Sequence, residues 1–293
     1  MTFSTTARPD TQGNEARQQD LRRIAKALSA ASALIPVNHG PAGSVERKER
    51  GDPVTEAERA VDRRLRMELV RDGEGWLCEE TPDDEERLRC ARVWVVDPLD
   101  GTREYISGIP EWCISIALIE NHEAVAGGIC NPATGETFIG SRETGLTRSG
   151  NVSNAELYRA GSDGLVLASR SEYRRGEWGC VSDAPFRVRP VGSVAYKLAL
   201  VAAGYADATW TLVPKHEWDV AAGVALVLAA GGTVQTLTGS RPRFNQPNPL
   251  LNGLFGISKD CHSQVRWQEY LPTAQESGVR SRESGVGSRL KTA

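Results

Sequence analysis

Apolar residues recur at helical spacing in two stretches of the N-terminal region. The first, from about Ala16 to Leu34, is predicted to be an amphipathic helix, and its apolar face carries Leu21, Ile24, Ala25, Leu28 and Ala31. A second helix is predicted from Thr55, with an apolar stripe at Ala57, Val61, Leu65 and Leu69. Residues 1–15 are expected to be disordered. The polar, Gly-containing stretch 38–52 is expected to be a mobile loop.

The pattern then changes to short runs of β-branched and aromatic residues. Strands are predicted at residues 92–96 and 113–119, and a hairpin at 124–140 with its turn near residues 131–135. Consecutive strands joined by short turns favour antiparallel pairing. This half of the chain is therefore expected to contain a mostly antiparallel sheet.

Strands and helices alternate in the second half. Strands are predicted at residues 165–168 and 233–237, and helices at 193–204 and 219–230, the last closed by Gly231-Gly232. This alternation indicates a mixed sheet covered by helices. The expected organisation is an N-terminal α+β domain over residues 16–158, a C-terminal α/β domain over 159–270 and a disordered tail over 271–293, which is rich in Ser, Gly and Arg.

Composition excludes several classes of function. The chain has 293 residues, 40% of them hydrophobic, and a formal net charge of −3, which gives no reason to expect a nucleic-acid polymer as partner. No apolar run is long enough for an integral membrane segment, and residues 1–19 lack the apolar core of a secretory signal. Six widely spaced cysteines predict no zinc site or disulfide framework. A cytoplasmic location is expected.

The candidate chemistry is concentrated in residues 97–102, Asp-Pro-Leu-Asp-Gly-Thr. Asp97 and Asp100 follow a buried strand, and Pro98 restricts the turn that would bring both to one point. Such hard oxygen ligands suit Mg²⁺. Two ions can support in-line displacement at phosphorus, but they need further carboxylates, for which Glu79, Glu80 and Asp219 are candidates.

Each of these residues also has an ordinary structural interpretation. Asp before Pro or Gly is a common turn former, and Glu79-Glu80 begins an acidic run typical of a solvated face. Asp219 suits the first turn of a helix, where acids are common. The argument for a site therefore depends on the combination and its order.

In that combination the chain resembles the inositol monophosphatase-like superfamily. Residues 95–102, Val-Val-Asp-Pro-Leu-Asp-Gly-Thr, match its first signature, and residues 217–223, Glu-Trp-Asp-Val-Ala-Ala-Gly, match its second. Residues 52–57 and Glu79-Glu80 match upstream elements, and the match extends from about residue 20 to 260. The resemblance implies an α+β fold, a layered αβαβα sandwich of the inositol monophosphatase/sugar phosphatase type.

The resemblance also implies roles for individual residues. Two or three Mg²⁺ ions would be held by Glu79, Asp97, Asp100, Asp219 and the carbonyl of Leu99. Gly101 and Thr102 would bind the phosphate through backbone N–H groups, and Asp219 would also contact substrate. Glu80 would support the ligands, and Thr102 would orient an attacking water. The resemblance further implies inhibition by Li⁺. Dimers are common in the resembling family, but no interface is readable in the sequence.

Glu58 is a departure from the family pattern. The upstream motif usually ends in Asp, which helps to activate the water, whereas this chain has Thr55-Glu-Ala-Glu58. Glutamate is one methylene longer, so its carboxylate must retract to reach the same water. The same four residues also match a helix capping box, so Glu58 has two alternative roles, one catalytic and one purely structural.

The resemblance extends to a particular substrate class. Residues 100–106, Asp-Gly-Thr-Arg-Glu-Tyr-Ile, are similar to a segment of 3′(2′),5′-bisphosphate nucleotidases, and Leu212 occupies a position where inositol monophosphatases commonly carry a glutamate. The implied substrate is adenosine 3′,5′-bisphosphate, cleaved at the 3′ position, with Arg170 and Lys197 as candidate ligands of the 5′-phosphate. Both could instead be surface cations. Trp178 and Tyr173 could stack on the base or serve packing alone, and Leu212 could line a face for the adenine ring. Inositol monophosphates, fructose 1,6-bisphosphate and other sugar phosphates are alternative substrates, and a ligand-binding protein without turnover is a further alternative.

Overall fold

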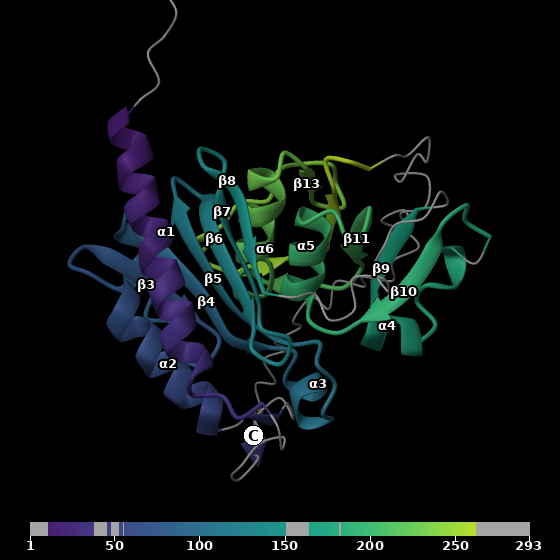
Figure 1. The fold of residues 1–293 in the computed structure, drawn as a ribbon, viewed down its shortest axis with the longest axis horizontal. Helices are drawn as coiled ribbons and strands as arrows, with labels where there is room; N and C mark the ends of the chain where they lie inside the picture. Colours follow the sequence, from purple (N-terminus) through teal and green to yellow (C-terminus); the bar gives the residue numbers. More distant parts are fainter. Residues whose placement is uncertain are drawn as a thin grey trace, which may run out of the picture.

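Two large sheets alternate with helices through the molecule, and one pair of helices lies between the two sheets (Figure 1). The computed structural model describes residues 11–37, 46–47, 53–54, 56–150, 164–181 and 183–261. The helices are α1 (Thr11–Ser32), α2 (Glu56–Leu69), α3 (Thr102–Ile106), α4 (Arg170–Arg174), α5 (Val194–Ala202) and α6 (Glu217–Ala229). Single 3-10 turns cover Glu86–Arg89 and Gly179–Val181.

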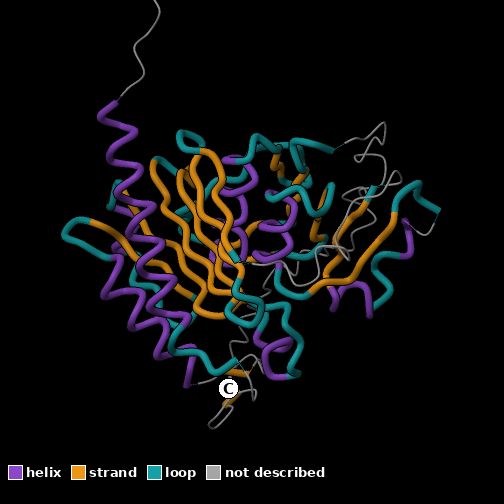
Figure 2. The backbone as a smooth tube through the Cα atoms, in the orientation of Figure 1, coloured by secondary structure: helices purple, strands orange, loops and turns teal. Residues whose placement is uncertain are grey.

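The first sheet has six strands in the order β3-β4-β5-β6-β7-β8. They are β3 (Glu74–Cys78), β4 (Arg92–Asp100), β5 (Cys113–Glu120), β6 (Glu123–Asn131), β7 (Glu136–Ser141) and β8 (Gly145–Ser149). All neighbours pair antiparallel except β3 and β4, which are parallel. The antiparallel sheet predicted from the sequence is therefore confirmed, and Figure 2 shows its strands side by side.

The second sheet is mixed and has the order β10-β9-β11-β15-β13. Its strands are β9 (Leu165–Ser169), β10 (Arg187–Val191), β11 (Ala208–Thr211), β13 (Thr233–Gln235) and β15 (Leu254–Ile257). Two small antiparallel pairs complete the strands, β1 (Glu46–Arg47) with β2 (Pro53–Val54) and β12 (Lys215–His216) with β14 (Leu250–Leu251).

Successive side chains of a strand point to opposite faces of its sheet, so each sheet packs against a different hydrophobic core on each face. On β4, Val93 and Val95 face a core shared with α5 and α6, whereas Trp94 and Val96 face a second core under α1 and α2. The second sheet repeats this division, because Leu165 and Leu167 lie in the central core and Val166, the residue between them, lies in a third core on the outer face. Helices α5 and α6 are therefore buried between the two sheets, which confirms the layered α+β arrangement.

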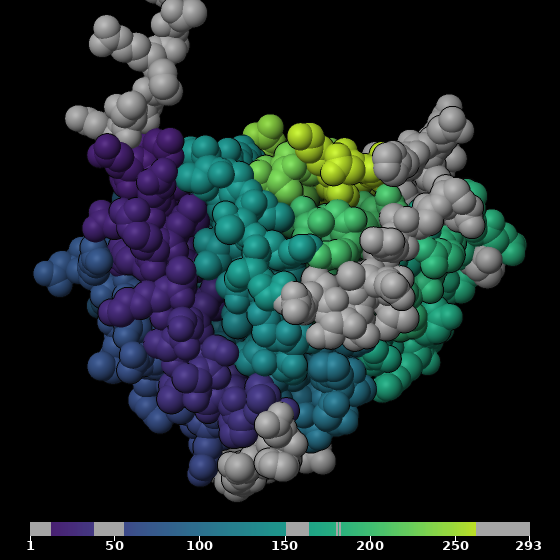
Figure 3. All heavy atoms as spheres, in the orientation of Figure 1, coloured from purple at the N-terminus to yellow at the C-terminus, as the bar shows by residue number. Residues whose placement is uncertain are grey.

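The layers follow one another broadly in the order of the sequence. Figure 3 shows α1 (purple) on one side of the first sheet (teal), with the C-terminal part of the chain (green to yellow) on the other side. Helix α6 is apolar around its whole circumference, because it contacts strands of both sheets. Its first turn, at the edge of this central layer, carries Asp219.

Some boundaries differ from the predictions. Helix α1 begins at Thr11, so the expected disorder of residues 1–15 is wrong for 11–15. Helix α6 begins at Glu217, two residues before the predicted start. Most of the predicted loop at 38–52, the boundary at 158/159 and the tail at 271–293 lie outside the described residues. Among the described helices, none has the length and apolar character needed to cross a bilayer.

Glu74 anchors an ion-pair network at the edge of the first sheet. Its carboxylate accepts hydrogen bonds from Arg23 at 3.0 and 2.5 Å, from Arg92 at 3.2 Å and from Trp94 Nε1 at 2.9 Å. Burial alone would raise the pKa of Glu74, but the hydrogen bonds from Arg23 and Trp94 outweigh burial and lower the pKa to about 2. The network therefore joins α1 to β3 and β4 through a carboxylate that stays ionised.

We expect this network to stabilise the protein in a pH-dependent way. Because the folded pKa of Glu74 lies below its ordinary value of 4.5, the stabilisation is complete above pH 4.5 and is lost as the pH falls toward 2. Glu74→Gln should lower the free energy of unfolding by about 2 kcal/mol at pH 7, after allowance for solvent screening, and by much less at pH 3. Urea unfolding at both pH values measures the difference. An equal loss at the two values would contradict the assignment.

Candidate active site

The carboxylates at the end of β4 are placed by an irregularity in the sheet. The register between β4 and β5 shifts between Asp97 and Asp100, where the chain leaves regular pairing. Asp97 Oδ1 accepts a hydrogen bond of 2.9 Å from the backbone N–H of Leu99, which holds the turn. Gly101 follows with φ of 100°, and a Cβ there would lie 3.0 Å from the backbone oxygen of Glu111. Both left-handed backbone and close packing therefore require glycine at this position.

Helices α5 and α6 supply the opposite wall of the site. Asp100 Oδ2 accepts hydrogen bonds from Ser193 Oγ at 2.6 Å and from the backbone N–H of Ala195, in the first turn of α5, at 2.7 Å. Asp219 lies in the first turn of α6, where its Oδ2 accepts the N–H of His216 at 2.8 Å. Asp100 and Asp219, which are 119 residues apart in the chain, are thus held by backbone groups at adjoining helix ends.

These elements enclose a pocket of about 280 Å³. All of the predicted metal ligands line it, as do the predicted phosphate-binding and cation residues: Glu79, Asp97, Leu99, Asp100, Gly101, Thr102, Arg170, Lys197 and Asp219. Glu80 lies next to Glu79 but outside this lining, and its side chain is half-buried. The residues that the sequence singled out separately therefore meet at one place.

Carboxylates are concentrated in the part of the pocket at the end of β4 and the start of α6. Burial raises the pKa of Asp97 well above its ordinary value, and the nearby charges of Glu79 and Asp100 raise it further. Burial also raises the pKa of Asp219, to about 8, with Asp100 adding to the effect and Lys215 opposing it. Since buried like charges are costly, a cation bound among them would offset their repulsion.

The donor set fits Mg²⁺. Carboxylates and one backbone carbonyl are hard oxygen donors, and in the described residues the hydrogen bonds of Asp97, Asp100 and Asp219 fall on one oxygen of each side chain. As the side chains stand, no group of three or more His, Cys, Asp or Glu in the described part of the chain surrounds a single point at ligand distance. The fit therefore concerns the chemistry of the donors and their shared pocket.

Glu58 contacts the other predicted catalytic residue directly. Its side chain is buried on α2, and its Oε1 accepts a hydrogen bond of 2.8 Å from Thr102 Oγ1. The same hydroxyl lies 3.2 Å from the carbonyl oxygen of Leu99. The extra methylene of glutamate is thus accommodated, and the Glu58 carboxylate binds the hydroxyl of Thr102, the residue predicted to orient the attacking water.

The two predicted basic residues differ in environment. Lys197 is buried, so the alternative that it is a surface cation is wrong; its Nζ donates to the carbonyl oxygens of Ser193 at 3.0 Å and Val191 at 3.4 Å. Burial, followed by the charge of Lys215, lowers the pKa of Lys197 to about 8. Arg170 is half-buried and forms a salt bridge with Glu111.

Two residues of the pocket region near Arg170 and Lys197, Glu111 and Lys215, were not predicted from the sequence. Glu111 Oε2 accepts both the Arg170 guanidinium and, at 2.7 Å, the backbone N–H of Gly192, so it orients the cation and the loop before α5 together. Lys215 lines the pocket from the short strand β12. Neither Glu111 nor Lys215 lies in a recognisable sequence motif. Ser193 was detectable as a helix N-cap, but its bond to Asp100 depends on tertiary structure.

The aromatic residues considered for base stacking lie elsewhere. Trp178 is buried and stacks on Trp210 with ring centroids 4.8 Å apart, so the interpretation that it stacks on a bound base is wrong. Tyr173 is exposed and does not line the pocket. Leu212 is buried in the same outer core as Trp178 and likewise does not line the pocket, so the expectation that it lines a face for an adenine ring is wrong.

Known proteins are similar to this chain in sequence and in fold. Residues 17–276 match the inositol monophosphatase family. An inositol-1-monophosphatase of Rhizobium meliloti is 32% identical over 74% of this chain and 85% of its own length. A 3′-phosphoadenosine 5′-phosphate phosphatase of Mycobacterium bovis is 34% identical over 64% of this chain and 70% of its own length.

A solved structure is similar across most of both chains. The crystal structure of CysQ from Bacteroides thetaiotaomicron, a bacterial member of the inositol monophosphatase family, has a TM-score of 0.70 and 26% identity, covering 83% of this chain and 98% of its own. The layered fold and the carboxylate-lined pocket define a phosphatase of this architecture. The chain belongs to the inositol monophosphatase family.

Proposed function

We propose that this chain is a Mg²⁺-dependent 3′(2′),5′-bisphosphate nucleotidase that releases the 3′-phosphate of adenosine 3′,5′-bisphosphate. The observation that carries the proposal is that one pocket is lined by two kinds of residue: the acidic residues at the end of β4, here called the acidic wall, and the cations Arg170 and Lys197, here called the basic wall. The acidic wall suits ions that bind the scissile phosphate. The basic wall supplies positive charge for a second phosphate, which an inositol monophosphate does not have.

Glu79, Asp97, Asp100, Asp219 and the Leu99 carbonyl would hold the ions. When bound, Mg²⁺ supplies charge stabilisation for a phosphoryl group and lowers the pKa of coordinated water. The backbone N–H groups of Gly101 and Thr102 would bind and orient the scissile phosphate.

Thr102 and Glu58 are proposed to orient the attacking water. A hydroxyl has one proton, and the geometry directs that of Thr102 to Glu58 at 2.8 Å. The lone pairs of the Thr102 oxygen are then available to accept a hydrogen bond from water in the pocket. Glu58 therefore acts through Thr102 as a positioning residue.

Phosphate release tests the assignment of substrate. With Mg²⁺ present, we expect kcat/KM for adenosine 3′,5′-bisphosphate to exceed that for inositol 1-phosphate by at least about tenfold, as two charge-assisted contacts to a second phosphate would give. A preference for inositol 1-phosphate would refute the proposal. It would instead indicate the activity named for the relative from Rhizobium meliloti, an inositol-1-monophosphatase.

Arg170 should contribute mainly to binding of the second phosphate. Arg170→Ala is expected to raise KM for adenosine 3′,5′-bisphosphate by about tenfold and to change KM for adenosine 3′-monophosphate little, because only the first substrate has a 5′-phosphate. Arg174→Ala, an exposed arginine at the end of the same helix, is the matched control. An equal change in KM for both substrates would refute this role.

A further inference from the structure

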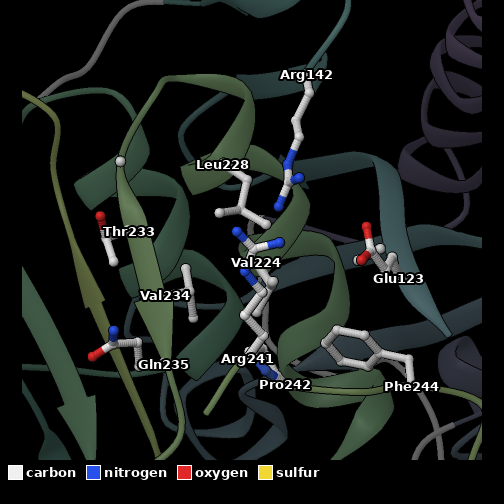
Figure 4. Close-up of a pocket in the computed structure, with 12 residues that line it drawn as sticks. Glu123, Arg142, Val224, Leu228, Thr233, Val234, Gln235, Arg241, Pro242 and Phe244 are labelled. Carbon is white, nitrogen blue, oxygen red and sulfur yellow. The ribbon is translucent and has the colours of Figure 1, made fainter. Parts of the chain in front are cut away.

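A second pocket, of about 250 Å³, lies at the other end of α6 from the acidic site. It is formed between the last two turns of α6, the start of β6, strand β13, the β7–β8 turn and the loop at residues 241–244. Figure 4 shows this pocket with its side chains. Since Asp219 and Leu228 are nine residues apart on one helix, the two pockets are separated by roughly 14 Å along its axis.

Two arginines from different elements converge in this pocket. Arg142, in the β7–β8 turn, and Arg241, in the loop after β13, extend their guanidinium groups toward one another beside Leu228 (Figure 4). Within the described residues, neither guanidinium has a carboxylate within ion-pair distance. Glu123 also lines the pocket, which leaves a net charge of +1 among these three side chains. Two unpaired cations facing one cavity favour an anion there.

The floor of the pocket is apolar. Val224 and Val234 are buried, Leu228 is partly buried, and Phe244 is 1% exposed. Figure 4 places these side chains below and beside the guanidinium groups. Leu228 is therefore the member of this floor with apolar surface left to cover, and a ligand with a small apolar body beside its anionic head would cover it.

The backbone that carries Arg241 is fixed by buried contacts. The N–H groups of Asn245 and Gln246 donate to Glu217 at 2.6 and 2.9 Å, and the N–H of Phe244 donates to the carbonyl of His122 at 3.0 Å. The turn that carries Arg142 is closed by the bond between the Ser141 and Thr144 hydroxyls at 2.9 Å. The two arginines therefore project from preformed backbone, which reduces the entropy lost on binding.

We propose that this pocket binds a small organic anion, with its oxyanion head held by Arg142 and Arg241 and its apolar body beside Leu228. The head can be a carboxylate, sulfonate or phosphate, because guanidinium groups bind all three in the same way. The site is separate from the proposed phosphatase site and does not depend on that activity.

The test uses 1-naphthalenesulfonate as probe, with titration calorimetry on the full chain. The wild-type protein should bind it, whereas Arg142→Ala/Arg241→Ala should bind it about 10- to 100-fold more weakly, as the loss of charge-assisted hydrogen bonds predicts. Arg243→Ala is the matched control, because Arg243 is exposed on the same loop but does not line the pocket. Neutral 1-naphthol should bind at least tenfold more weakly than the sulfonate.

Two further variants locate the binding. Leu228→Asp places a negative charge on the pocket floor and should abolish binding, whereas Asp219→Asn, in the other pocket, should leave the affinity unchanged. Far-ultraviolet circular dichroism verifies that each variant is folded. Absence of wild-type binding at millimolar probe, equal binding by the double-arginine variant, or loss of binding in Asp219→Asn would each overturn the proposal.

Discussion

Asp97→Asn is expected to lower kcat/KM for Mg²⁺-dependent phosphate release by at least about 10²–10³-fold while making the metal-free protein more stable. The loss follows because Asp97 is a proposed ligand at the centre of the acidic wall. The gain follows because burial and the charges of Glu79 and Asp100 already disfavour its ionised form. An amide at this position removes one of several like charges and still accepts the hydrogen bond from Leu99.

Phosphate release and thermal unfolding in EDTA measure these two effects on the same samples. Asp72→Asn, an exposed aspartate in the turn before β3, is the control and should change neither quantity. The combination is specific, because a merely structural aspartate would lose stability on substitution. Activity within tenfold of the wild type would remove Asp97 from the proposed site.

Glu58→Gln is expected to lower kcat by about 10²-fold and leave KM nearly unchanged. Glutamine is similar in size and can still accept the hydrogen bond from Thr102, so the fold should be retained, but it lacks the negative charge that polarises the hydroxyl. The change therefore affects orientation and activation of water and not the binding of substrate. Steady-state kinetics at saturating Mg²⁺ separate the two parameters.

Glu56→Gln provides the comparison on the same helix, since Glu56 is exposed in the first turn of α2. The capping interpretation of the motif predicts a different result for Glu58→Gln, namely a lower unfolding temperature with kcat intact. Glu58→Asp adds a further comparison, because it restores the residue usual in the family. Retention of full kcat in Glu58→Gln would assign Glu58 a structural role only.

The candidate acidic site could be predicted from the sequence because its parts are local. Asp97, Asp100 and Thr102 lie within six residues at the end of an apolar run, and Asp219 begins a helix with a recognisable signature. The antiparallel sheet was also predictable, since its strands follow one another through short turns. In both cases neighbours in the chain are neighbours in space.

The remaining features depend on contacts between distant segments. Ser193 binds Asp100 across 93 residues, and the burial of Lys197 follows from the position of α5 between two sheets. Strand β8 is short and largely exposed, and β10 contains a proline, so neither has the apolar pattern of a buried strand. The second pocket combines Arg142 and Arg241, which are 99 positions apart and carry no shared motif.

Calorimetric titration of Mg²⁺ into the wild type and Asp219→Asn tests the central claim most directly. The claim is that Asp219 and the β4 carboxylates, far apart in sequence, bind the same ions. It predicts saturable binding to the wild type and binding at least about tenfold weaker in the variant, since a charged ligand has been removed. Identical Mg²⁺ isotherms for the two proteins would contradict the shared site and, with it, the proposed phosphatase mechanism.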